Sequence, residues 1–410
     1  MKTILFIILI SVQAFAQEIL SYNLDVKINV KEKTILVKGF IDIDFKDKDS
    51  VTFILWKNSS IYEINSSNAE IKYEFDTASA SPMYMPNGKN LVLSKTSESN
   101  SKQSILFGYK IDAGQIKGWA KSFTEDWIEL NLYSAWFPVY WGDFTAKILV
   151  HIDEGYGVTG AGVVSKKEDH WELLKPWRSY DNVVIAAKNL KSKTLQENSV
   201  YIQTDYSSTG FSDSDADSVV TECKYVMNMF QNLFGKTDST YLKFIVAPFE
   251  QGGGYSRKNY VRMGTKDFNL YTRGGIAHEI AHFWWHNADA TTWEDWLNEA
   301  FAEYSMLLYV RERLGLEEFQ KIVNEYKNRT GNLSPVWGID RNANDAYSVL
   351  YEKGSLILCE MEEMIGKTVF LNFLKEVSAG RIAKTEDLLN LMEKILTKEI
   401  RLELENKLKS

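Results

Sequence analysis

The sequence predicts two domains of different class, an N-terminal antiparallel all-β domain and a mainly α-helical C-terminal domain. Three observations lead to this prediction. The chain has 410 residues, which is too long for one ordinary core and fits two domains of typical size. From residue 18 to about residue 190, apolar and polar residues alternate in short runs, as in half-buried strands. From residue 272 to residue 408, the apolar residues recur mostly at helical spacing.

The strand pattern is clearest in residues 22–28 and 41–45, where apolar side chains occupy every second position. Residues 148–152 form a short, mostly apolar run that suits a buried strand. Clusters of Asn, Gly, Ser and Asp separate these runs. This spacing favours an antiparallel all-β domain.

The character of the sequence changes after about Asp205. Residues 212–234 begin with Asp and Ser, carry an apolar stripe and stop at Gly235, which is the pattern of an amphipathic helix. Residues 241–247 predict a strand. We therefore expect the domain boundary between residues 195 and 212. With an N-terminal signal peptide, the predicted regions are 1–16, 17–205 and 206–410.

The N-terminus has the features of a secretory signal peptide. Lys2 supplies a positive charge, residues 4–10 are apolar, and residues 14–16 form a small-x-small cleavage site before Gln17. The apolar run is far shorter than the roughly 20 residues of a membrane span. An uncleaved anchor or a buried strand is the alternative. We expect cleavage near Ala16/Gln17 and a secreted or periplasmic mature chain without an integral membrane segment.

The composition limits the classes of partner that the protein is expected to bind. The formal net charge is −8, from 47 basic and 55 acidic residues, and no basic stripe is present. We therefore expect no nucleic-acid partner. Cys223 and Cys359 both lie among apolar residues at helical spacing. Buried free thiols are expected in preference to a disulfide.

The most informative motif is H-E-x-x-H, formed by His278, Glu279 and His282. Residues four apart lie on one helix face, so the two imidazoles can bind one ion. Glu279 is rotated by about 100° from His278 and can reach a water beside the metal, as a general base must. Two core histidines would be the alternative. However, three of the five histidines in the chain fall within residues 278–286, which favours a metal site.

A catalytic zinc needs a third protein ligand and one open position. His286 is one candidate, but eight residues of helix separate it from His278 by about 12 Å. Both could reach one ion only if the helix ended directly after His282. Glu299, on a second helix that follows a turn, is the other candidate and the one we favour. Glu303 lies one turn further on. Its carboxylate either supports a zinc-binding histidine or forms an ordinary ion pair.

These residues resemble the gluzincin aminopeptidases, the family of aminopeptidase N. The resemblance rests on H-E-x-x-H, on W-L-N-E-x-F-A-E-Y around Glu299, and on Y-E-K-G at residues 351–354. It implies a saddle-like β-domain, a thermolysin-like catalytic domain, one Zn²⁺ per chain and a peptide or protein substrate. It also implies that Tyr351 stabilises the oxyanion. A weaker likeness at residues 136–138 places Glu129 near the substrate amine.

The sequence departs from this family in three places. Glu299 follows His282 by 17 residues, two fewer than usual in the family. The large C-terminal helical domain of many relatives has no counterpart, which implies a more open active site. The family's substrate strand G-x-M-E-N is replaced by Gly253, Gly254, Tyr255, Ser256 and Arg257, so that Ser256 stands where the amine-binding Glu is expected.

The predicted activity is peptide hydrolysis by a zinc-activated water, with Glu279 as general base, and the enzyme is expected to be aminopeptidase-like. Because Ser256 stands where the amine-binding Glu is expected, a zinc endopeptidase with an open cleft is an alternative function. A secreted non-catalytic binding protein on a peptidase fold is a third possibility. It is disfavoured because Glu279 and Tyr351 are both present, and only chemistry requires that pair.

Overall fold

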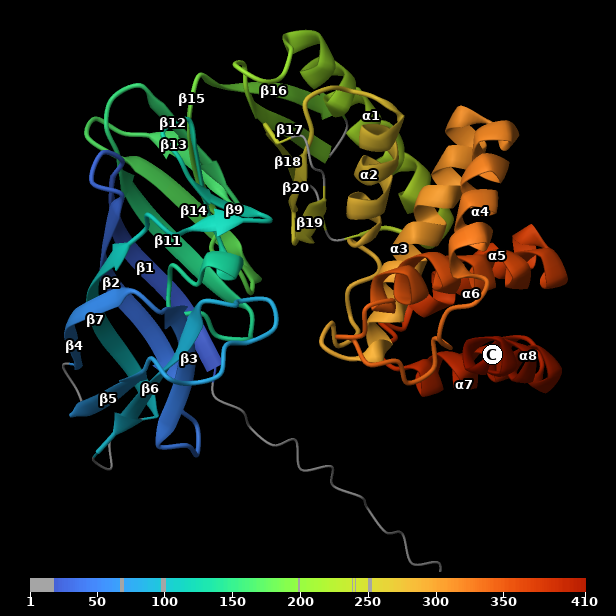
Figure 1. Ribbon diagram of the computed structural model, residues 1–410, viewed down its shortest axis with the longest axis horizontal. Coiled ribbons are helices and arrows are strands. Elements are labelled where there is room, and N and C mark those ends of the chain that lie inside the picture. Colours follow the sequence, from blue (N-terminus) through green and yellow to red (C-terminus); the bar gives the residue numbers. More distant parts are fainter. Residues whose placement is uncertain are drawn as a thin grey trace, which may run out of the picture. The chain divides into compact units, whose positions relative to one another are not determined.

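The computed structural model describes residues 18–66, 70–96, 101–197, 200–237, 239, 241–249 and 253–410. The predicted signal peptide, residues 1–16, lies outside them. The chain divides into two compact units, one comprising residues 1–154 and 158–185 and the other residues 155–157 and 186–410. The two units are coloured from blue to green and from green to red in Figure 1.

The first unit is all-β, and its strands form three sheets. A seven-stranded sheet has the order β13-β14-β11-β1-β2-β7-β4, a three-stranded sheet the order β3-β6-β5, and a five-stranded sheet the order β12-β15-β10-β9-β8. Strands β12 and β15 run across the division between the units. The strands are β1 Glu18–Asn29, β2 Thr34–Asp44, β3 Ser50–Trp56, β4 Ser59–Ser66, β5 Ile71–Asp76, β6 Gly88–Lys95, β7 Lys102–Asp112, β8 Lys117–Gly118, β9 Lys121–Phe123, β10 Trp127–Leu130, β11 Phe144–His151, β12 Tyr156–Gly160, β13 Val163–Lys166, β14 Trp171–Ser179 and β15 Val184–Lys188.

The alternation seen in the sequence is the alternation of the two faces of the large sheet. In β1, Leu24, Val26 and Ile28 are buried, and the residues between them point to the other face. The prediction of an all-β domain is thereby confirmed. One pairing differs from the expected antiparallel pattern, because β1 and β11 run parallel to each other.

The second unit contains a mixed sheet of order β16-β17-β18-β20-β19, in which β17, β18 and β20 are parallel. Its strands are β16 Leu190–Glu197, β17 Val200–Ser207, β18 Tyr241–Ala247, β19 Gly254–Arg257 and β20 Tyr260–Gly264. Strand β16 and most of β17 lie within residues 17–205, which the sequence assigned to the first domain. The two compact units divide at residues 185/186, and the sequence places its domain boundary at 205/206. Strand alternation marks a strand but not the sheet to which it pairs, which explains the difference.

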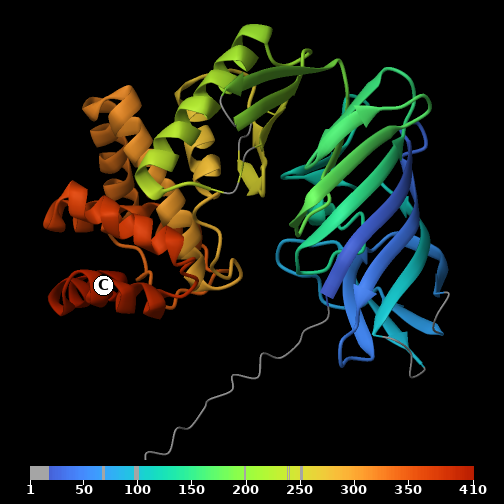
Figure 2. The same cartoon turned by 180° about the vertical axis from the view of Figure 1, so that it is seen from behind.

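Eight helices of the described chain complete this unit, and Figure 2 shows them from behind. They are α1 Asp213–Phe234, α2 Leu270–Ala281, α3 Trp296–Tyr309, α4 Leu316–Thr330, α5 Gly354–Ile365, α6 Lys367–Ala379, α7 Thr385–Ile395 and α8 Lys398–Lys409. The predicted helix 212–234 is present as α1. Ser212 caps its N-terminus by accepting from the N–H of Asp215, and Gly235 ends it with a φ of 94°.

The packing of the helices places α2 beside the edge of the sheet. Helix α1 packs on β16 and β17, and α2 packs on β19 and β20 and against α1 and α3. Cys223 in α1 and Cys359 in α5 are buried free thiols, as predicted. Within the described residues, no helix is both long enough and apolar enough to cross a bilayer.

Candidate metal centre

Helices α2 and α3 bring three potential metal ligands together. His278 lies in the last turn of α2, and the helix ends at Ala281 with His282 as its C-cap. Glu299 lies in the first turn of α3. Its Oε2 is 3.4 Å from the Nε2 of His278 and 3.4 Å from the Nε2 of His282. The three ligand atoms all lie within 4.8 Å of one another, which is close enough to share one ion.

The second nitrogen of each imidazole is held by the protein. Nδ1 of His278 is 2.6 Å from Oε2 of Glu303, and Nδ1 of His282 is 2.9 Å from the carbonyl oxygen of Trp285. A carbonyl oxygen only accepts, so Nδ1 of His282 donates and its Nε2 keeps a lone pair. This arrangement fixes the orientation of both rings and leaves Nε2 as the ligand atom, as is typical of metal-binding histidines.

The donor set fits a divalent cation. Oε2 of Glu299 is buried and has no hydrogen-bond partner among the described residues. Burial opposes ionisation of Glu299, but the nearby imidazoles of His282 and His278 outweigh it and hold the pKa of this carboxyl below its usual range. A buried, ionised oxygen without a donor is costly unless a cation compensates it. Two imidazoles and one carboxylate form a usual zinc set, with a fourth position left for water.

Glu279 lies against the edge strand β19. A Cβ added at Gly254 would lie 2.4 Å from Oε1 of Glu279, so only glycine leaves the carboxylate its present place. Burial is the main cause that raises the pKa of Glu279, while the two histidines and Arg257 lower it and Glu299 raises it further. A carboxylate whose pKa is raised by burial is suited to accept a proton near neutral pH.

Strand β19 contains the predicted substrate residues. Gly253, directly before it, has a φ of 107°, a left-handed conformation that favours glycine. In the described chain β19 pairs only with β20, so its other edge is not bonded within the sheet. Tyr255 is buried, and Ser256 is partly exposed. The edge can pair with an extended peptide in β fashion.

Tyr351 lies beside the metal group, in a π-helical segment, Ser348–Lys353, that precedes α5. Its ring stacks on that of His278, with the centroids 5.9 Å apart and the planes at 5°. Burial, followed by the charges of Glu299 and Asp295, raises the pKa of its hydroxyl well above the usual value. Tyr351 therefore stays protonated and can donate a hydrogen bond.

Three participants were not identified from the sequence. Tyr326, in α4, donates to Oε1 of Glu303, so the carboxylate that holds His278 is itself held. Asp295 is buried and accepts from Arg341, at 3.0 Å. Burial, followed by the charge of Glu299, raises the pKa of Asp295 to about 6. Trp285 acts through its carbonyl oxygen, which no side-chain motif can reveal.

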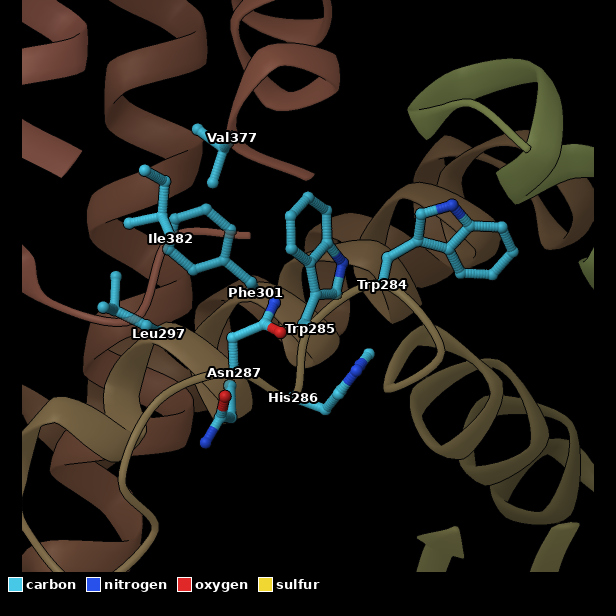
Figure 3. Close-up of a pocket in the computed structure, with 9 residues that line it drawn as sticks. Trp284, Trp285, His286, Asn287, Leu297, Phe301, Val377 and Ile382 are labelled. Carbon is cyan, nitrogen blue, oxygen red and sulfur yellow. The ribbon is translucent and has the colours of Figure 1, made fainter. Parts of the chain in front are cut away.

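Two other residues singled out in the sequence, His286 and Glu129, are not part of the group formed by His278, His282 and Glu299. Nδ1 of His286 bonds to the carbonyl oxygen of His282, at 2.8 Å. Figure 3 shows His286 on the wall of a small cavity, with the apolar side chains of Phe301, Val377 and Ile382 on the other side. The cavity encloses about 10 Å³, room for about one water. Glu129 lies in β10 of the first unit, is fully buried, and accepts from Nε1 of Trp127 at 3.2 Å.

Comparison with known proteins agrees with this chemistry. Residues 264–406 match the peptidase family M1 domain. Among solved structures, a two-domain M1 zinc metallopeptidase bound to L-tryptophan is similar over 96% of this chain and 95% of that chain, with a TM-score of 0.76 and 14% identity. The M1 zinc metallopeptidase of Deinococcus radiodurans covers 96% and 94%, with a TM-score of 0.72 and 16% identity. The leukotriene A4 hydrolase of Saccharomyces cerevisiae covers 94% and 66%, with a TM-score of 0.71 and 15% identity.

The solved structures share the fold, and the family match covers the segment that contains all three ligand candidates, Glu279 and Tyr351. The alternative of a non-catalytic binding protein is therefore set aside. Residues 264–406 match a peptidase family M1 domain, and this match, together with the fold shared with M1 zinc metallopeptidases, supports a zinc metallopeptidase.

Proposed function

We propose that the chain is a secreted aminopeptidase-like enzyme that hydrolyses peptide bonds with Glu279 as general base. One observation carries the proposal. His278, His282 and Glu299 converge on one point, while Glu279 lies beside the edge strand on which a peptide can pair. Zinc, when bound there, supplies a Lewis acid for the scissile carbonyl and lowers the pKa of a water.

Each residue around this point has a separate role in the proposed reaction. Glu279 takes a proton from the attacking water at its carboxylate and passes it to the leaving amine. Glu303 and the carbonyl of Trp285 keep the two imidazoles aimed at the metal position. Because Tyr326 restrains Glu303, the orientation of His278 depends on two successive hydrogen bonds.

Tyr351 stabilises the charge that develops on the carbonyl oxygen. Its hydroxyl is protonated because burial and nearby carboxylates raise its pKa. Its ring stacks on that of His278 and also on that of Tyr347, whose centroid is 4.3 Å away. A positioned donor of this kind contributes about 3 kcal/mol to transition-state stabilisation.

Peptide binding is assigned to β19. The edge of β19 that does not pair with β20 can pair with the main chain of an extended substrate, whatever its side chains. Recognition of a free N-terminus requires a carboxylate near the amine. The family resemblance of the sequence assigns that role to Glu129, and this stays a prediction.

Ser256 favours a second candidate function, that of a zinc endopeptidase. A partly exposed hydroxyl stands where a carboxylate would bind the substrate amine. The next residue, Arg257, is a buried cation close enough to Glu279 to lower its pKa. Both features weaken the attraction for an ammonium group at this strand. Cleavage of peptides with blocked N-termini is then expected alongside aminopeptidase activity.

The experiment compares kcat/KM on matched peptides with free and acetylated N-termini. The variants are Ser256→Glu, Glu129→Gln and, as an inactive reference, Glu279→Gln. We expect measurable cleavage of acetylated peptides by the wild type and a shift toward free amines in Ser256→Glu. Strict rejection of acetylated peptides by the wild type, lost in Glu129→Gln, would assign the specificity to Glu129 alone.

Secretion is proposed from the N-terminal pattern of Lys2, the apolar residues 4–10 and the small-x-small site at residues 14–16. Expression of the full chain in a bacterial host with fractionation, followed by N-terminal sequencing, tests it. We expect a periplasmic or extracellular chain that begins at Gln17. A cytoplasmic chain that retains Lys2 would contradict the proposal.

A further inference from the structure

The two histidines outside the catalytic segment meet in the first unit. His151 ends β11, and His170 lies in the turn between β13 and β14. Their ring centroids are 5.5 Å apart, with the planes at 40°. The chain has only five histidines, and the other three lie in residues 278–286. All five are thus found in two clusters.

Each of the two rings has a carboxylate beside it. Oδ1 of Asp25, from the parallel neighbour β1, is 3.4 Å from Nε2 of His151. Oδ1 of Asp169 is 2.7 Å from Nδ1 of His170. Nε2 of His151 is buried and forms no hydrogen bond with any residue of the described chain. Its lone pair or proton is therefore left for another partner.

The catalytic centre of the same chain provides a scale for these distances. There, the two imidazole centroids are 5.0 Å apart, and each Nε2 is 3.4 Å from the ligand carboxylate. There, too, a second carboxylate holds the Nδ1 of one histidine, at 2.6 Å. The cluster in the first unit has similar parts, with Asp25 beside the Nε2 of His151 and Asp169 beside the Nδ1 of His170, but its ligand atoms do not converge as closely as those of the catalytic group.

We propose that His151, His170 and Asp25 form a second metal site, which binds a borderline divalent cation such as Zn²⁺. Asp169 orients His170 by accepting from its Nδ1, so that its Nε2 is the ligand. Imidazole and carboxylate are the donors that this class of ion prefers. The ligands come from β1, β11 and the β13–β14 turn, so a bound ion would cross-link three segments of one sheet. The site is separate from peptidase chemistry and does not rest on it.

The two sites differ in how complete they are. In the catalytic group all three ligand atoms lie within 4.8 Å. In the second site the ligand atoms of Asp25, His151 and His170 do not meet this limit, so His170 and the Asp169 that holds it must move together to bring Nε2 toward His151. The His170 side chain is 21% exposed and that of His151 is 26% exposed, so the ring has room to turn. We therefore expect weaker binding than at the catalytic centre.

The test is calorimetric titration of zinc into the full chain after a chelator has removed any bound metal. Citrate in the buffer suppresses nonspecific binding of zinc to the surface. We expect two binding events per wild-type chain. His151→Gln and, separately, His170→Asn should each remove the weaker event and keep peptidase activity. Glu299→Ala should remove the tighter event and keep the weaker one. Asp169→Asn should weaken the second event about tenfold, the usual effect of losing a carboxylate behind a metal-bound histidine.

Glu63→Gln is the matched control, because Glu63 is an ion-paired carboxylate on β4, at the opposite edge of the same sheet. It should leave both events unchanged. Thermal unfolding without zinc identifies any variant that fails to fold, in which case the other histidine variant and Asp169→Asn decide. A single event in the wild type would overturn the proposal, as would two events in the folded double variant His151→Gln, His170→Asn.

Discussion

Gly254→Ala tests the placement of the general base. The added Cβ would lie 2.4 Å from Oε1, 2.7 Å from Cδ and 2.8 Å from Cγ of Glu279. Ordinary contact lies near about 3.5 Å, so the carboxylate must move by about 1 Å. The side chain is flexible enough to do this without unfolding the strand. Because a misplacement of about 1 Å can lower a rate about 100-fold, we expect kcat to fall by about that factor.

The assay is kcat on a chromogenic aminoacyl substrate, with zinc content from elemental analysis and thermal unfolding of each variant. Gly274→Ala is the matched control. It adds the same methyl group to α2, the helix of the base, but the nearest atoms lie 3.7 Å away on the side chain of Met306. The control should keep full activity. A fall of less than about threefold in Gly254→Ala, with zinc retained, would amount to under 1 kcal/mol and would refute the assigned position of the base.

Three further variants test the remaining roles. Glu299→Ala should strongly weaken zinc binding, measured by competition with a chromophoric chelator, whereas His286→Ala should not; equal losses would make His286 a ligand. Tyr351→Phe should lower kcat about 100-fold with unchanged zinc content, since it removes one oxyanion donor, and a raised KM at constant kcat would instead assign Tyr351 to ground-state binding. Glu303→Gln should weaken zinc binding about 10- to 100-fold by loosening His278, and unchanged affinity would mean that Trp285 and Glu299 suffice to orient the site.

Much of the fold could be predicted because local periodicity reports local structure. The alternation in residues 22–28 and the apolar stripe of residues 212–234 each identify one element, β1 and α1. Pairing between strands is a different matter. Strands β16 and β17 alternate like those of the first unit, but β17 pairs in parallel with β18 across a helix. Nothing in a strand's own period states which partner it has, so the boundary predicted from the sequence lies beyond the division of the compact units at residues 185/186.

The metal site, like the fold, could be predicted from the sequence only in part. The spacing of His278 and His282 fixes their separation on one helix turn, so sequence alone brings them together. Their supports come from positions without a motif. Tyr326 lies on another helix, and the Trp285 carbonyl belongs to the backbone. Likewise, His151 and His170 approach each other only because β14 folds back on β11.

Strand β19 connects specificity to the strength of the base. The Cβ direction of Gly254 points at Glu279, and side chains two apart on a strand share a face, so Ser256 faces the same side as Gly254. A carboxylate at position 256 would attract a substrate amine, but it would also place a like charge near Glu279. Burial already raises the pKa of Glu279, and Arg257 partly offsets it. A second carboxylate would raise that pKa further, because it disfavours the ionised base. In Ser256→Glu the acid limb of the kcat/KM profile should therefore move to higher pH, together with the gain in preference for free amines. A shift to lower pH, or a gain in preference with no shift, would separate the two effects and place Ser256 away from the base.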